Sequence, residues 1–179
     1  MKVTLLVFAF LWSSTLGAQR ILLLNGTAHI GNGNVMESAA IGVINDRIAF
    51  VKNSLTQSFP SKDWDTIINC NGQHFYPSFV SANNTLGLTE IDAVRATRDY
   101  NDVGDWNPHV RAQIAFNVES RVVETVRTNG VLLVQATPRG GRISGSSAVM
   151  KLSGWNWEDA TVLADDGIHL NWPSDPKNY

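Results

Sequence analysis

One segment, residues 118 to 138, constrains the fold more than any other: VESRVVETVRTNG followed without a break by VLLVQATP. Its first half has apolar residues at helical spacing, with Asn117 as a suitable N-cap and Asn129-Gly130 as a C-terminal stop. The residues of the predicted apolar face are Val118, Val122, Val123 and Val126. The second half is an almost uninterrupted apolar run, typical of a strand buried on both faces. A helix that turns directly into a buried strand predicts an α/β barrel or a doubly wound sheet.

The chain before this segment, from Arg20 to about Val80, has a different pattern. Short apolar runs are broken by Asn-Gly, Gly-Asn-Gly and Asn-Asp, which tolerate the backbone dihedrals of tight turns. The runs ILLLNG, THIGNG, AAIGVINDRIAFV and DTIINCNGQHFYPSFV are therefore predicted as strands, and the polar stretch 54–64 as a loop. Strands of this length and spacing indicate a small sheet or a β-sandwich. Further on, NWEDATVLA (156–164) is predicted as another short helix.

The first 18 residues, MKVTLLVFAFLWSSTLGA, follow the order of a secretory signal peptide, with a lysine, an apolar run and then small residues. The apolar run is far shorter than the ~20 residues of a membrane-spanning helix, so a transmembrane protein is not expected. We expect export to the periplasm or the medium after cleavage near Ala18. A net charge of −2 and a pI near 6.0 leave no basic field that would attract nucleic acid. Because Cys70 is the only cysteine, no internal disulfide can form. Cys70 lies in an apolar run and is predicted to be buried.

Three segments are therefore expected: a signal peptide over 1–18, a β-sandwich module over 19–76, and the start of a (β/α)₈ barrel over 77–179. A complete barrel takes about 250 residues, and about 100 follow residue 80. The expected fold class is α/β with an N-terminal β module, in which sandwich strands lead into the first part of an incomplete barrel.

Two stretches carry a resemblance to a known family: INDRIAFV (44–51) and the pattern D-x-I-I-x-x-x-G-Q-x-x-Y-P-S-F-V over 65–80. They resemble the start of amidohydrolases, in particular imidazolonepropionase-like members. The resemblance implies a β-sandwich made from both chain ends, beside a metal-hydrolase type of (β/α)₈ barrel. It also implies hydrolysis of C–N bonds in cyclic amides or related small molecules, with zinc or another divalent metal as cofactor.

The family's first barrel strand ends in Asp, any residue, His, any residue, His, and this chain departs from that motif. Ser81 stands in place of the Asp, and Asn83 and Thr85 stand where the two metal-binding histidines belong. Neutral amide and hydroxyl oxygens are poor ligands for a borderline metal such as zinc. The family's remaining ligands would fall beyond Tyr179, so no cofactor is predicted for this chain. The segments GLTEIDAVRATRDYNDVG, TPRGGRISGSSAV and WNWEDA resemble an exported bacterial subgroup that shares the missing motif.

Two functions stay open at this point. The first is an amidohydrolase-type hydrolase, of which this chain is an N-terminal fragment with a degenerate metal site and is by itself inactive. The second is a non-catalytic exported homologue that binds a small molecule, forms a homo-oligomer or pairs with an active related amidohydrolase.

Arg139, Arg142 and Ser144 form the strongest candidate for ligand binding, in the loop RGGRISGSS after the predicted buried strand. Backbone N–H groups and guanidinium groups there could bind an anion, and the alternative is a glycine turn with solvated arginines.

Other candidates have equally ordinary explanations. The charged segment from Glu90 to Asp105 could supply a catalytic carboxylate or form a solvated loop. Asp165-Asp166 is a weak cation signal. Four tryptophans could stack on a cyclic ligand or pack in a core or interface: Trp106, Trp155, Trp157 and Trp172. The four histidines show no ligand spacing and are interpreted as structural or surface residues: His29, His74, His109 and His169.

Overall fold

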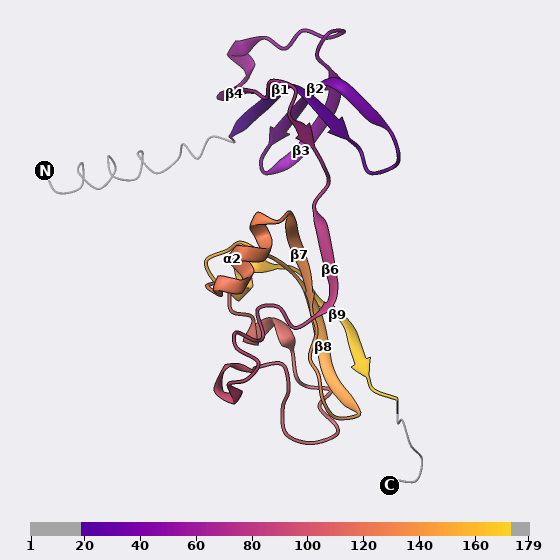
Figure 1. Ribbon diagram of the computed structural model, residues 1–179, viewed down its shortest axis with the longest axis vertical. Helices are drawn as coiled ribbons and strands as arrows, with labels where there is room; N and C mark the ends of the chain where they lie inside the picture. Colours follow the sequence, from indigo (N-terminus) through magenta and orange to yellow (C-terminus); the bar gives the residue numbers. More distant parts are fainter. Residues whose placement is uncertain (1–18, 173–179) are drawn as a thin grey trace, which may run out of the picture. The chain divides into compact units, whose positions relative to one another are not determined.

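The computed structural model describes residues 19–172, which form two compact units divided between Pro77 and Ser78 (Figure 1). Each unit is built on one β-sheet. The signal peptide expected over residues 1–18 lies outside the described residues. Between residues 19 and 172, no helix has the length and apolar character needed to cross a membrane.

The first unit is a five-stranded sheet with the order β3-β2-β1-β4, in which β5 also pairs with β1. β1, β2 and β3 form an antiparallel meander, while β4 and β5 both run parallel to β1. The strands are β1 (Arg20–His29), β2 (Val35–Ile44), β3 (Arg47–Asn53), β4 (Thr66–Asn69) and β5 (His74–Phe75). The predicted loop 54–64 is confirmed apart from one short turn of 3₁₀ helix. A sandwich needs two sheets packed face to face, and residues 19–77 contribute only one.

The predicted turn at Asn25-Gly26 is wrong, because β1 continues through it. Asn25 has φ 59° and the register to β2 shifts between Leu23 and Gly26, which makes this a β-bulge. Asparagine accepts the left-handed region, so the strand keeps its pairing on both sides of the bulge. The turn at Asn45-Asp46 is confirmed, with φ 52° and 60° at its two central residues, as a two-residue hairpin loop requires.

The main hydrophobic cluster of the first unit is small, with Ala28, Ala39 and Ile41 as its buried members, and Leu22 and Ala40 are also fully buried. Partly buried residues pack around it: Leu23, Met36, Val43, Val51 and Phe75. Cys70 is buried as predicted.

The second unit is a four-stranded sheet with the order β6-β7-β8-β9. Its strands are β6 (Phe79–Asn84), β7 (Val131–Ala136), β8 (Ile143–Lys151) and β9 (Thr161–Leu170). Its helices are α2 (Arg121–Thr128) and the single turn α3 (Trp157–Ala160), with 3₁₀ turns at Arg95–Thr97 and Ala112–Ala115.

The predicted α/β pattern is right for β6, α2 and β7, because β6 and β7 are parallel and α2 lies in the connection between them. It is wrong for the rest of the unit, where β8 and β9 are antiparallel to their neighbours. The predicted helix 156–164 ends at Ala160, and Thr161 already pairs with β8. The described strands therefore form an open mixed sheet, and residues 19–172 close no barrel.

Helix α2 begins later than predicted. Its N-cap is Ser120, whose Oγ accepts a hydrogen bond from the Val123 N–H at 3.4 Å. The proposed cap Asn117 instead accepts a hydrogen bond from the Glu119 N–H, two residues on, in the local turn that asparagine favours. The predicted end is confirmed, because Asn129 is the C-cap and Gly130 has φ 86°.

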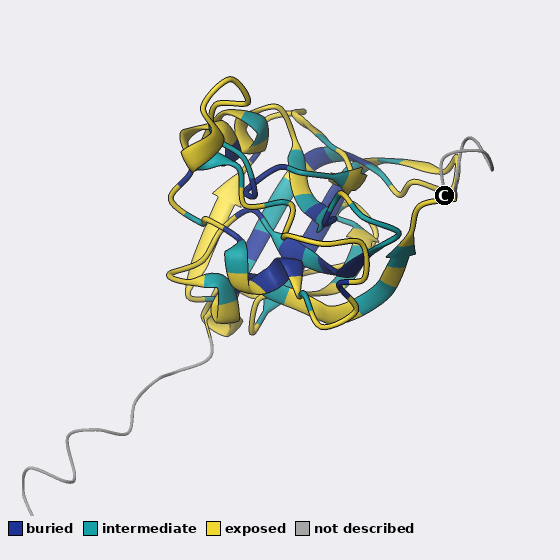
Figure 2. Ribbon diagram, turned by 90° about the horizontal axis from the view of Figure 1, so that it is seen from below, coloured by how far each residue is buried: buried dark blue, intermediate teal, exposed yellow. Residues whose placement is uncertain are grey.

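The main core of the second unit lies between the sheet and the segments that cover one face of it. Figure 2 shows buried residues along the strands and exposed loops around them. β7 contributes Val134 and Ala136, neither of which is exposed, whereas Val131, Leu133 and Gln135 on its opposite face are only half-buried. The prediction that β7 is buried on both faces is thus wrong, because no second layer of the described residues covers its other face.

Candidate functional site

Because β6 and β7 are parallel, both end at the same edge of the sheet. The last pair of the ladder joins Asn84 to Ala136, and the Thr137 N–H donates to the Asn84 carbonyl at 2.8 Å. The segments that leave this edge carry Thr85 on one side and Arg139 on the other. Ligands of α/β proteins bind at the carboxyl ends of parallel strands, so a ligand-binding site is expected at this edge.

Arg139 and Asn83 join the two strand ends through a bidentate contact. One terminal nitrogen of the guanidinium donates to the Asn83 side-chain carbonyl at 2.7 Å, and the other donates to the Asn83 backbone carbonyl at 2.6 Å. Asn83 has φ 51° and lies where the register between β6 and β7 shifts, so it interrupts the regular alternation of the strand. The residue in the expected position of a metal ligand therefore holds a cationic side chain.

A row of polar side chains continues from Asn83 across the sheet in the order of its strands. Gln135 on β7 accepts from the Asn83 N–H at 3.0 Å and donates from Nε2 to the Asp166 carboxylate on β9 at 2.6 Å. Ser147 on β8 is fully buried and donates from Oγ to the same carboxylate at 3.1 Å. These contacts fix the orientation of Asp166, because both of its oxygens accept from anchored donors.

His169 lies within the electrostatic reach of this row. Burial lowers the pKa of His169 below its ordinary value of 6.5, while the Asp166 carboxylate raises that pKa and the Arg139 guanidinium lowers it. The net direction is down, so the imidazole is mainly neutral at pH 7. The site thus combines a cation, a carboxylate and a neutral imidazole, which can donate or accept a proton.

The residues at this edge do not fit the divalent metal that the resemblance implies. The side-chain oxygen of Asn83 already accepts from a guanidinium, and a metal ion bound there would be repelled by that fixed positive charge. Within residues 19–172, no three His, Cys, Asp or Glu side chains lie close enough together to hold a metal ion.

In the rest of the predicted anion-binding loop, the Ser144 side chain and the Arg142 backbone make internal contacts. Ser144 is buried; its Oγ donates to the Gly140 carbonyl at 2.7 Å and accepts from the Asn171 side chain at 2.9 Å. The Arg142 N–H donates to the Asp105 carbonyl at 2.7 Å. Arg139, Arg142 and Ser144 therefore do not converge through these contacts on one point, and their role in ligand binding stays a prediction.

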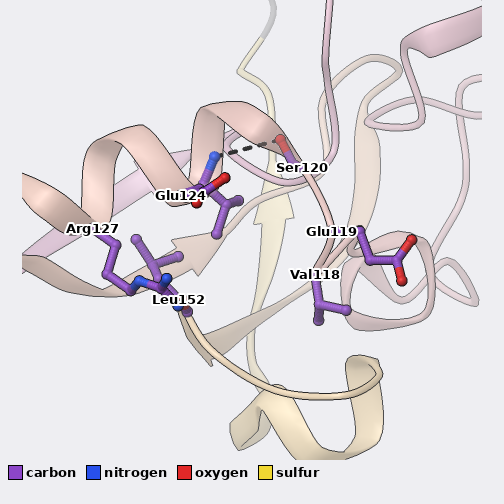
Figure 3. Close-up of a pocket in the computed structure, with 7 residues that line it drawn as sticks. Val118, Glu119, Ser120, Glu124, Arg127 and Leu152 are labelled. Atoms are coloured by element: carbon purple, nitrogen blue, oxygen red, sulfur yellow. Dashed lines mark hydrogen bonds between the residues drawn. The ribbon is translucent and has the colours of Figure 1, made fainter.

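A separate cavity of about 140 Å³ lies at the start of α2 (Figure 3). Its lining comprises Val118, Glu119, Ser120, Val123, Glu124, Arg127 and Leu152. Ser120 donates to Glu90 at 2.8 Å, and the other Glu90 oxygen accepts from the Asn117 side chain at 3.1 Å. Glu90, the first residue of the predicted charged segment, thus connects that segment to the helix start.

Asp165 and Asp166 are adjacent in the sequence but bind different partners. The Asp165 carboxylate pairs with the Arg111 guanidinium, and that hydrogen-bonded pair lowers the pKa of Asp165. Arg111 also borders an open cleft of about 550 Å³ with Asp99, Asp102 and His109. The charged segment therefore lines a concave surface. Of the four tryptophans, Trp106, Trp155 and Trp172 are exposed, whereas Trp157 packs against the core of the second unit.

Sequence reasoning did not identify Gln135 as part of a site. The signal was available, because Gln135 is the one polar residue within the apolar strand VLLVQA. A polar side chain in such a strand needs a partner, and here it has one on β6, Asn83, and one on β9, Asp166.

The comparisons with known proteins bear on the fold. No protein-family model matches the sequence, and no curated protein matches it. Among solved structures, an amidohydrolase from Thermotoga maritima MSB8 superposes with a TM-score of 0.76 at 24% sequence identity, over 88% of this chain. An ochratoxinase from A. niger overlaps with 44% of the chain at 17% identity and a TM-score of 0.35, which supports no conclusion.

The likeness to the Thermotoga protein defines the class of fold: this chain has the fold of the corresponding part of an amidohydrolase. The matched region is 40% of that protein, so the chain spans well under half the length of the structure it resembles.

Proposed function

We propose that this chain is the N-terminal part of an exported amidohydrolase-like protein, processed near Ala18, that recognises a small polar molecule at the β6–β7 edge. The observation that carries the proposal is the bidentate contact of Arg139 with Asn83 at that edge. The amidohydrolase fold supports the placement of a ligand there. The expected pairing with a related amidohydrolase or a second copy belongs to the same proposal.

The ligand chemistry follows from the groups that remain available. A guanidinium has five N–H donors, and one contact from each terminal nitrogen to Asn83 leaves three for a carbonyl or carboxylate. The Asp166 carboxylate, held by Gln135 and Ser147, has further acceptor positions for an N–H group. A cyclic amide carries a carbonyl and an N–H group on adjacent atoms, so it complements a site with both kinds of partner. His169, mainly neutral at pH 7, is the group that could accept a proton.

A second function is hydrolysis of a C–N bond by the whole protein. The amidohydrolase fold favours it, and the missing catalytic groups would have to come from outside this chain. In that reading Arg139 and Asp166 orient the substrate, and Asn83 holds Arg139 in place.

The test uses the intact protein, with dihydrouracil as the cyclic amide. We expect calorimetry to show binding, and Arg139→Lys to weaken it by roughly 10-fold or more, because the ammonium cannot reproduce the bidentate contact. Arg121→Lys is the matched control, since the Arg121 side chain is exposed and pairs with Glu124 of the same helix, α2. Equal affinity for the wild type and the Arg139→Lys variant would refute the proposed site.

Elemental analysis and a turnover assay separate the two functions. An equivalent or more of bound zinc together with release of the ring-opened product favours the hydrolase. Binding without turnover in a metal-free preparation favours the non-catalytic homologue.

A further inference from the structure

Two histidines that are far apart in the sequence meet on the first sheet. β1 and β5 pair in parallel, with Thr27 opposite His74 and Ala28 opposite Phe75. Residues two apart in a strand share a face, so His29 lies on the same side as Thr27 and His74. Ala28 and Phe75 point to the other side, into the core. His29 and His74 are therefore neighbours on the face of this ladder opposite to Ala28 and Phe75.

The two imidazole rings are held in a defined geometry. His29 Nε2 and His74 Nδ1 are 2.9 Å apart, and the ring centroids are 5.2 Å apart with an angle of 26° between the planes. Tyr76 stacks on His29 with the ring centroids 4.2 Å apart. The sheet ladder and this stacking restrict the rotation of both imidazole rings. A ligand that binds them therefore loses less affinity to the ordering of these side chains.

We propose that His29 and His74 form a two-nitrogen binding site for a divalent transition-metal ion of the Cu²⁺ type. Imidazole nitrogens bind such ions at about 2.0–2.1 Å. Two nitrogens at that distance, separated by an angle of about 90°, are about 2.9 Å apart, whereas a tetrahedral angle requires roughly 3.3–3.4 Å. The observed 2.9 Å corresponds to neighbouring positions of a square-planar ion.

Ligand type leads to the same choice of metal. Imidazole suits copper, nickel and zinc, whereas calcium and magnesium require oxygen ligands. Divalent copper binds more tightly than nickel or zinc to a given nitrogen site, and copper and nickel accept square-planar geometry. The site has two protein ligands, with no third His, Cys, Asp or Glu grouped with them in residues 19–172. Water or an external ligand therefore completes the coordination.

The site is independent of the proposed function, because it involves none of the residues at the β6–β7 edge. The competing explanation is that the two rings share a hydrogen bond and bind nothing. Metal binding and a structural hydrogen bond predict different responses to added copper, so the two explanations can be separated.

The first experiment titrates Cu²⁺ into the intact protein and follows binding by electron paramagnetic resonance. We expect one site with hyperfine coupling to imidazole nitrogens, and we expect His29→Gln and His74→Gln each to weaken it on the order of 100-fold, because each leaves a single ligand. His109→Gln is the matched control and should leave the titration unchanged. Unchanged binding in both folded variants would overturn the proposal.

The second experiment needs no substitution and so does not depend on the folding of a variant. Wild-type protein is treated with diethyl pyrocarbonate with and without one equivalent of Cu²⁺, and modification of each histidine is quantified by peptide mass spectrometry. Protection of His29 and His74 relative to His109 is the expected result. Equal modification of all three histidines in the presence and absence of Cu²⁺ would overturn the proposal.

Discussion

Gly26 is the residue on which the pairing of β5 with β1 depends most directly. A Cβ atom at this position would lie 2.0 Å from Cε2 of Phe75 and 2.9 Å from the backbone carbonyl of Gln73. Ordinary carbon contacts are about 3.5–4.0 Å, so the Phe75 ring would have to move by roughly 1.5 Å or more. The carbonyl of Gln73 cannot move freely, because it accepts the hydrogen bond from the Thr27 N–H at 2.9 Å. We therefore predict that Gly26→Ala destabilises the first unit by about 1–3 kcal/mol, the cost of an overpacked core.

Gly167→Ala is the matched control for this substitution. Gly167 also lies in a strand and has an ordinary φ, but the nearest atom to its added Cβ would be Ser147 Oγ at 3.7 Å, a normal contact. We expect this change to be neutral or to stabilise by up to about 1 kcal/mol, because alanine restricts the unfolded chain.

The assay is urea unfolding of the intact protein, with hydrogen exchange of peptides covering β1 and β5 to assign the effect to the first unit. Phe75→Leu in the Gly26→Ala background should recover part of the loss, since the smaller side chain relieves the contact. If Gly26→Ala and Gly167→Ala had the same effect on unfolding, the steric reasoning would be refuted. The same variant should also weaken copper binding, because a displaced β5 separates His74 from His29.

Three further predictions concern the second unit. Ser120→Ala should destabilise α2 by about 1 kcal/mol, measured by hydrogen exchange, whereas Asn117→Ala should cost less because Asn117 is not the cap. In titrations followed by nuclear magnetic resonance, Asp166→Asn should lower the pKa of His169, and Arg139→Met should raise it; shifts in the opposite directions would contradict the assigned causes. The pKa of His169 is lower in the folded chain than its unfolded value of 6.5, so the unfolded chain binds more protons below about pH 6.5. The contribution of His169 to the free energy of unfolding should therefore decline as the pH falls below about 6.5. His169→Gln should reduce that decline.

Local features of the fold could be predicted from the sequence. The helix in 118–130, its end at Asn129-Gly130 and the strand after it follow from side-chain spacing and from a glycine that accepts a positive φ. The hairpin turn at Asn45-Asp46 has the same kind of origin. The predicted N-cap is wrong for a different reason: Asn117 and Ser120 are both good caps by local pattern, and the contact of Asn117 with Glu90 depends on a partner 27 residues away.

The second half of the sheet could not be predicted from local patterns. Residues 161–164 were predicted as helix, yet they form a strand because β8 supplies hydrogen-bonding partners over most of its length. The order of strands depends on pairings between distant segments, and periodicity alone does not reveal them.

The candidate sites depend on tertiary structure even more strongly. The sequence by itself determined that Asn83 and Thr85 stand where the resemblance expects histidines, because that conclusion needs only residue identities. Only the folded chain brings Arg139 to Asn83 across 56 residues and His29 to His74 across 45 residues. Turn dihedrals and side-chain spacing are properties of neighbouring residues, whereas a site is made by side chains that strand pairing and packing bring together.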